Sequence, residues 1–173
     1  DSVTYTNNIT NVSSSNFANM VIIDRLPGVN DRGVVNWQDQ RESEFSVAYL
    51  GNLRLTVEDS DQNSTSVDSS KYTIQFSNIG ANEAYTEDDF DGEMDESRWH
   101  NNWQNGDTSF RIIMTNGFAL KPGETLVIRY DGKISDDANP GQIAWNSFGY
   151  RYSAGANSTY LRAEPPKVGV MIQ

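Results

Sequence analysis

The chain has 173 residues, of which 36% are hydrophobic and 21% charged, and its formal net charge is -11 at pH 7. A chain this acidic lacks the cationic surface that binds phosphate backbones or anionic membranes, which argues against nucleic acid as a partner. The absence of cysteine excludes disulfides, thiolate metal sites and cysteine nucleophiles. No apolar run approaches the length of a transmembrane helix, so we expect no membrane insertion.

Short alternating segments bounded by turn residues recur along the whole chain, which is typical of an all-β sandwich or barrel. Such strands are numerous enough for two packed antiparallel sheets. The predicted strands are Val3–Thr10, Ala18–Asp24, Val34–Trp37, Glu44–Tyr49, Leu53–Glu58, Tyr72–Phe76, Phe110–Thr115, Thr125–Tyr130, Ile143–Tyr152, Thr159–Ala163 and Val168–Ile172.

The second predicted strand contains a run, Met20–Ile23, that is apolar at every position, as in a strand buried on both faces. The run ends at Asp24, which is followed by Arg25 and the strand breaker Pro27. Three states of this carboxylate remain open. It pairs with Arg25 or another donor, it accepts bonds from backbone amides of the following turn, or desolvation raises its pKa until it stays protonated.

Alternation is clearest in the strand Thr125–Tyr130, where Leu126, Ile128 and Tyr130 share one face and a tight Asp-Gly turn follows. The late strand "GQIAWNSFGYRYS" is unusual because it places an uncharged amide, Asn146, among the aromatic residues of one face. A buried amide without hydrogen-bond partners costs about 1 to 3 kcal/mol, so we expect Asn146 to have a specific partner.

An acidic segment, Asn82–Asp107, breaks the alternating pattern. Trp99 and Trp103 are four residues apart, which predicts a short helix with both indoles on one side. Asp95 is the predicted N-cap, and Gly106 follows the predicted end.

Four carboxylates of this segment suggest a cation site. Calcium prefers carboxylate oxygens from a turning loop, although Gly92 does not stand where the glycine of an EF-hand loop is required. A solvated acidic loop is the alternative interpretation. The predicted calcium ligands are Asp89, Asp91, Glu93 and Asp95.

Flat indole rings suit sugar stacking, so Trp37, Trp99 and Trp103 are candidate ligand-binding residues, with core packing as the alternative. His100 is the only histidine, and no nucleophile elbow accompanies it, so a Ser-His-Asp hydrolase is not indicated. The abundance of carboxylates is not evidence for a glycosidase, and we expect no enzymatic turnover.

Four stretches of the sequence carry a resemblance to a known family. The chain is similar in these stretches to DUF11-like or CnaA-like immunoglobulin-type domains of Gram-positive surface adhesins and pilins. The resemblance implies an immunoglobulin-like β-sandwich over residues 1–173, with 38–107 as an insertion and 164–173 as the last strand or a junction to a following module. The stretches are "VTYTNNITNVSSSNFANMVIIDRLP", "LKPGETLVIRYDGKI", "AWNSFGYRYS" and "AEPPKVGVMI".

Many members of that family join a lysine of an early strand to an asparagine of a late strand by a spontaneous isopeptide bond, assisted by a buried acid. The resemblance assigns the acid to Asp24 and the acceptor to Asn146. The early strand contains no lysine, and among the four lysines Lys167 is the candidate nucleophile. A lysine outside this chain and the absence of any bond are the alternatives.

The sequence therefore predicts an extracellular adhesion module at a bacterial cell surface. Its expected partners are a host or matrix glycan or protein ligand and neighbouring modules of the same polypeptide. The rival prediction is a carbohydrate-binding module with a tryptophan platform and a structural calcium ion.

Overall fold

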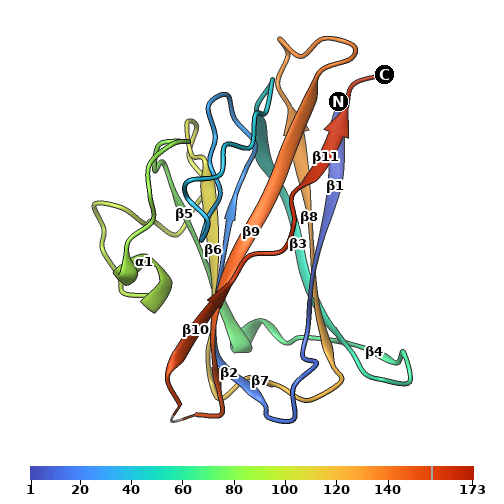
Figure 1. Cartoon of the computed structure of the whole chain (residues 1–173), viewed down its shortest axis with the longest axis vertical. Helices are drawn as coiled ribbons and strands as arrows, with labels where there is room; N and C mark the ends of the chain where they lie inside the picture. The colour runs from blue at the N-terminus through green and yellow to red at the C-terminus, as the bar shows by residue number, and fades with distance from the viewer. Residues whose placement is uncertain (157) are drawn as a thin grey trace.

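Two antiparallel sheets face each other along the long axis of the molecule (Figure 1), in a computed structural model that describes residues 1–156 and 158–173. The first sheet has four strands in the order β1-β8-β3-β4. Its strands are β1 (Ser2–Thr10), β3 (Val47–Glu58), β4 (Ser64–Ser66) and β8 (Thr125–Ile134).

The second sheet has seven strands, with the path β10-β9-β2-β6-β5, while β11 also pairs with β9 and β7 with β2. Its strands are β2 (Phe17–Arg25), β5 (Tyr72–Ser77), β6 (Ser109–Met114), β7 (Ala119–Leu120), β9 (Ile143–Ala154), β10 (Tyr160–Ala163) and β11 (Val168–Met171). A 3-10 turn, η1 (Ser69–Lys71), and a short helix, α1 (Glu87–Asp91), complete the elements. The predicted two-sheet, antiparallel all-β fold is confirmed.

The main core lies between the sheets, where the predicted alternation is confirmed. The predicted turn at Asp131–Gly132 is wrong, because β8 continues through it and pairs with β1 there. Leu126, Ile128 and Tyr130 of β8 are fully buried, and they face Phe110 and Ile112 of β6, which are also fully buried. Burial of these large apolar and aromatic side chains supplies the main stabilising term of the sandwich.

A second apolar cluster covers the outer face of the second sheet. This cluster explains why Met20–Ile23 of β2 is apolar at every position. Alternate side chains of the run enter the main core, and the others pack under the long loops. The strand is therefore buried on both faces, as predicted. The second cluster consists of Val21, Ile23, Val34, Ile79, Phe90 and Trp99.

Buried arginines tie these loops to the sheet. Arg25 donates to three backbone carbonyls within residues 80–83 at 2.6 to 2.8 Å. Arg111 donates to the carbonyls of Asp89 and Glu93, both at 2.8 Å. Burial lowers the pKa of Arg111 to about 10. These bonds satisfy the loop carbonyls that have no strand partner.

The predicted helix between residues 95 and 106 is wrong. The helix forms earlier, at Glu87–Asp91, because Thr86 and Asp89 make a reciprocal capping box and Gly92 ends it with φ 73°. Asp95 instead accepts the amide of Ser97 at 3.0 Å, which starts a turn.

Residues 38–107, which we expected to be an insertion, supply β3 to one sheet and β5 to the other. Two predicted strands merge into β3, with register shifts around Gly51, whose φ is 111°. Within the described residues, no helix is long and apolar enough to cross a membrane. Asp1 and Gln173 lie at the same end of the long axis (Figure 1).

Candidate functional site

A buried carboxyl group connects the two sheets. Asp24 of β2 has no exposed surface, and its Oδ2 atom accepts hydrogen bonds from Asn7 Nδ2 at 2.7 Å and Tyr130 OH at 2.9 Å. Asn146 Nδ2 donates to the same oxygen at 3.2 Å. We call these four residues, which come from β1, β2, β8 and β9, the Asp24 cluster.

The Asp24 cluster lies in the buried interior, where ionisation of a carboxyl group is unfavourable. Burial raises the pKa of Asp24 to about 6, against the opposing effect of its three hydrogen bonds. Burial and the nearby Asp24 charge also hold the pKa of Tyr130 well above its usual range. Within the described residues, Asp24 Oδ1 and Asn146 Oδ1 have no hydrogen-bond partner. Of the three states left open by the sequence, the first and third combine: Asp24 has side-chain donors and a raised pKa.

Lys167 does not join the Asp24 cluster. Its Nζ donates to the carbonyl of Arg41 at 3.1 Å and lies 4.6 Å from the centroid of the Trp145 ring. Successive residues of a strand point to opposite faces, so the Trp145 side chain and Lys167 lie on the outer face and Asn146 on the inner one. The side chain of the early strand β1 that contacts Asp24 is Asn7, and β1 contains no lysine.

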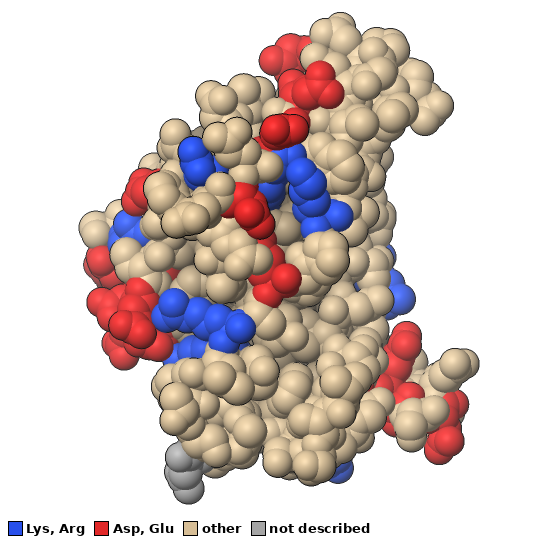
Figure 2. All heavy atoms as spheres, in the orientation of Figure 1, with Lys and Arg blue, Asp and Glu red and all other residues tan. Residues whose placement is uncertain are grey.

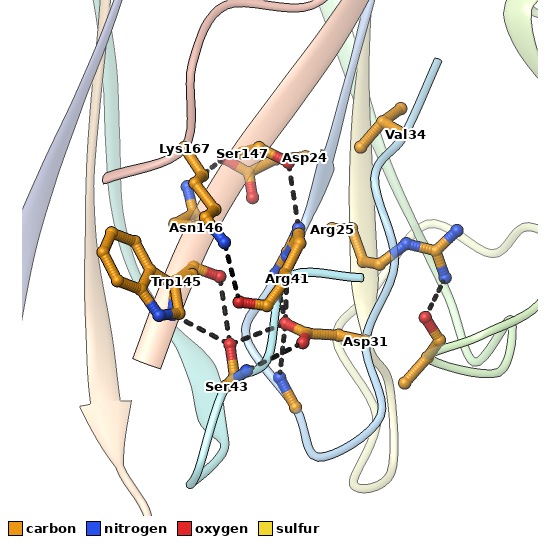
Figure 3. Close-up of polar contacts among 12 residues, drawn as sticks. Asp24, Arg25, Asp31, Val34, Arg41, Ser43, Trp145, Asn146, Ser147 and Lys167 are labelled. Carbon is orange, nitrogen blue, oxygen red and sulfur yellow. Dashed lines mark hydrogen bonds and ion pairs between the residues drawn. The ribbon is translucent and has the colours of Figure 1, made fainter. Parts of the chain in front are cut away.

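A polar network on the outer face anchors the loop before β3 (Figure 3). Arg41 is 1% exposed, and its Nε donates to Asp31 Oδ2 at 2.9 Å. Its Nη1 donates to Ser147 Oγ of β9 at 3.2 Å. Ser43 also donates to Asp31, at 2.7 Å. Arg41 Nη2 also lies 2.8 Å from Asp31 Oδ2, so the two buried charges are paired, and hydrogen bonds to Ser43 and Ser147 add to the pairing.

The predicted strand Val34–Trp37 is wrong. These residues form a bend, and the three backbone amides of residues 34–36 donate to the carboxylate of Glu164 at 2.8 to 3.0 Å. Ser147 Oγ donates to the same carboxylate at 2.7 Å. Sequence reasoning missed Glu164, because the backbone amides that it binds are about 130 residues away and no local pattern marks it.

The surface around this bend is hollowed. A pocket of about 690 Å³ lies between the bend and the segment before β11, and hollows of about 290 and 590 Å³ border the same loop. We call residues 29–42 together with 164–167 the loop surface. It is polar, and it is supported from beneath by the ion pair and the second apolar cluster.

The three candidate tryptophans do not form a common platform. Trp99 is 1% exposed, and its Nε1 donates to Asp89 Oδ1 at 2.8 Å. Trp103 packs on the main core beside Tyr49, with ring centroids 5.8 Å apart. Trp37, on the loop surface, is 39% exposed. Trp99 is therefore part of the core and Trp103 packs against it, whereas Trp37 is the most exposed of the three, with its Nε1 donating to Asn82 O at 2.8 Å and Arg32 at 5.0 Å from its ring.

We expect Trp99→Ala to lower the free energy of unfolding by about 3 to 5 kcal/mol, because it empties a buried site and removes one of the donors to the Asp89 carboxylate. Trp37→Ala is the matched control and should change stability by about 0.5 kcal/mol or less. Denaturant unfolding of both variants measures the difference. Equal losses in the two variants would contradict the assignment of Trp99 to the core.

The four predicted calcium ligands are Asp89, Asp91, Glu93 and Asp95. They do not converge, and no group of three or more candidate ligands is placed to hold a metal ion in the described part of the chain. Arg98 pairs with Asp89 at 2.7 Å, and Arg151 with Asp91 at 3.1 Å. Burial opposes ionisation of Asp89, but the hydrogen bonds from Arg98 and its other donors outweigh it and lower the pKa. Figure 2 shows Asp and Glu side chains beside α1 with Lys and Arg next to them.

No family model and no curated protein sequence matches this chain. Two solved structures are similar in fold. One is ACE19, the collagen-binding subdomain of the Enterococcus faecalis surface protein ACE, with 11% identity, a TM-score of 0.45, and coverage of 98% of this chain and 87% of that one. The other is the collagen-binding domain of a Staphylococcus aureus adhesin, with 15% identity, a TM-score of 0.37, and coverage of 94% and 86%.

Both similarities are weak, and they assign no function to the chain. The architecture rests on the molecule's own sheets. The residues brought together are the Asp24 cluster between the sheets and the loop surface outside them, and the chain is a two-sheet antiparallel β-sandwich that carries these two features.

Proposed function

We propose that this chain is an extracellular adhesion module of a bacterial surface protein and that the loop surface contacts a host matrix ligand. The observation that carries the proposal is the loop surface itself, a hollowed polar region built on a rigid sheet by the Arg41–Asp31 ion pair. Binding residues on loops that a rigid scaffold positions are typical of recognition modules. The resemblance of the sequence to surface adhesin domains supports the same function.

The chemistry of the loop surface suits an extended peptide ligand. Asn36, Gln38 and Gln40 are exposed amides, which both donate and accept hydrogen bonds. Trp37 adds a flat apolar ring beside them. A polyproline II chain exposes unpaired carbonyls and proline rings, which are recognised by donors and aromatic side chains. Triple-helical collagen is built from such chains and is therefore the first probe to use.

The Asp24 cluster has a supporting role in this proposal. It joins β1 of one sheet to β2 and β9 of the other through side-chain hydrogen bonds. No lysine hydrogen-bonds to Asp24 or Asn146 in the described part of the chain. We therefore infer that hydrogen bonds of the Asp24 cluster, and no isopeptide bond, join the two sheets of the native module. An intact mass equal to the sequence mass is the expected result, and loss of one ammonia would contradict the inference.

Trp37→Ala should weaken binding to immobilised triple-helical collagen about tenfold or more, because aromatic anchors dominate binding surfaces. Tyr160→Ala is the matched control, since Tyr160 is 51% exposed but lies on β10, outside the loop surface. Surface plasmon resonance measures both affinities.

Binding of the wild-type chain to a glycan array, lost in Trp37→Ala, would favour the rival carbohydrate-binding module. If neither collagen nor glycans bind, or if Trp37→Ala leaves collagen affinity unchanged, the loop surface is not the adhesive site.

A further inference from the structure

The geometry points to Glu164 as the positioning residue of the loop surface. Its carboxylate fixes the bend at residues 34–36, and with it the backbone that leads into Trp37, whose indole Nε1 also donates to Asn82 O at 2.8 Å. The effect on ligand binding rests on the proposed function, but the effect on the bend does not. The inference starts from the four donors that converge on this one side chain: three successive backbone amides and the hydroxyl of Ser147.

The bend is shaped to receive an anion. Gly33 N donates to Asp39 O at 2.9 Å, and Asp39 N donates to Asn36 O at 3.0 Å, which closes residues 33–39 into a tight loop. A Cβ at Gly33 would lie 2.3 Å from Asn36 O, so only glycine fits this turn. The amides of residues 34–36 then point to one side and form a nest for negative charge. Without Glu164 these three amides would lose their hydrogen-bond acceptor.

The backbone on both sides of Glu164 is also held in place. Glu164 lies between β10, which ends with Ala163 paired to Tyr150, and β11, which begins with Val168 paired to Asn146. The next two residues are prolines, which have no amide to pair with β9, so the segment departs from the strand at this point. The strands before and after Glu164 therefore both pair with β9, which fixes the position of Glu164 between them.

Ser147 connects Glu164 to the loop that contains Arg41. Its hydroxyl donates to Glu164 Oε2 at 2.7 Å and lies 3.2 Å from Arg41 Nη1, which donates to it. A continuous chain of bonds thus runs from Glu164 through Ser147 to Arg41 and Asp31. It links the C-terminal strands to the loop before β3 across the outer face of β9. Displacement of the segment before β11 would therefore remove the acceptor that holds the bend at residues 34–36.

The test is Glu164→Gln, which keeps the size of the side chain but removes its charge. We expect amide hydrogen exchange of residues 34–36 to accelerate about tenfold or more, because charge-assisted bonds to backbone amides are lost. Glu96→Gln is the matched control, since Glu96 is exposed and lies outside the loop surface. Ser147→Ala keeps the carboxylate and should give a smaller acceleration at the same amides.

Unchanged exchange at residues 34–36 in folded Glu164→Gln would overturn the proposal, as would an acceleration spread evenly over the whole sandwich. If Glu164→Gln fails to fold, Ser147→Ala decides, and unchanged exchange there overturns the proposal. Collagen affinity of Glu164→Gln is measured in parallel and should fall together with protection of the bend. Faster exchange with full affinity would overturn the role in binding. If the wild type binds no collagen, the proposed function fails, and the exchange data still decide whether Glu164 positions the bend.

Discussion

Replacing Asn7 by lysine is expected to create a covalent cross-link between β1 and β9. Asn7 Nδ2 and Asn146 Nδ2 both contact Asp24 Oδ2, at 2.7 and 3.2 Å, so an amine that enters from position 7 arrives beside the Asn146 amide. Desolvation lowers the pKa of a buried lysine and raises that of Asp24, so the amine loses its proton and the carboxyl can hold one.

The reaction balances without a further reagent. The lysine Nζ attacks Cγ of Asn146, the Nζ–Cγ bond forms, and the Cγ–Nδ2 bond breaks. Asp24, which hydrogen-bonds the Asn146 amide, takes one proton from the attacking amine and delivers one proton to the departing nitrogen, which leaves as ammonia. A link between residues 7 and 146 closes a very long loop, for which the entropy of the unfolded chain predicts about 4 to 5 kcal/mol of stabilisation.

Intact mass spectrometry of Asn7→Lys should show the loss of one ammonia, and thermal unfolding should shift upward. The double variants Asn7→Lys/Asp24→Ala and Asn7→Lys/Asn146→Ala are the controls, and each should keep its full sequence mass. A folded Asn7→Lys protein that retains its ammonia would show that the Asp24 cluster does not have the geometry of a cross-linking site.

The second large effect concerns pH. The pKa of Asp24 is about 6 in the folded state and 3.8 in the reference state, so folding favours the protonated form. Its contribution to stability is fully present below about pH 4 and is lost as the pH rises through 6. The difference corresponds to about 3 kcal/mol, at 1.36 kcal/mol for each unit of pKa.

Asp24→Asn isolates this contribution, because the amide is similar in shape to the protonated acid and does not titrate. The two proteins should have similar unfolding free energies at pH 4, and the variant should be more stable by about 3 kcal/mol at pH 7. Urea unfolding at both pH values measures the difference, and the other carboxylates cancel in the comparison. Parallel stability curves for wild type and variant would show that Asp24 does not titrate in this range.

Local patterns predicted the strands and the buried positions well. Alternation placed Leu126, Ile128 and Tyr130 in the core, and the apolar run before Asp24 correctly indicated a strand buried on both faces. These predictions succeed because period-2 burial is a property of a few consecutive residues. The partners of Asp24 were only partly foreseen, since Asn7 shows no local sign of its role.

The failures have a common cause. Val34–Trp37 reads as a short strand, but its amides bind the carboxylate of Glu164, which is distant in sequence. Trp99 and Trp103 have helical spacing, yet they belong to different apolar clusters. In both cases a tertiary contact overrides the local preference, and a single sequence carries no signal of that contact.

The position of the two chain ends has a mechanical consequence. A tensile force that separates Asp1 from Gln173 acts at one end of the sandwich, across the strands instead of along them (Figure 1). Such a load opens the β1–β8 ladder one hydrogen bond at a time, beginning near Ser2, where little force is needed. The first side-chain tether to the opposite sheet that this opening meets is Asn7 bound to Asp24. The Asp24 cluster therefore determines how far β1 peels before the sandwich yields.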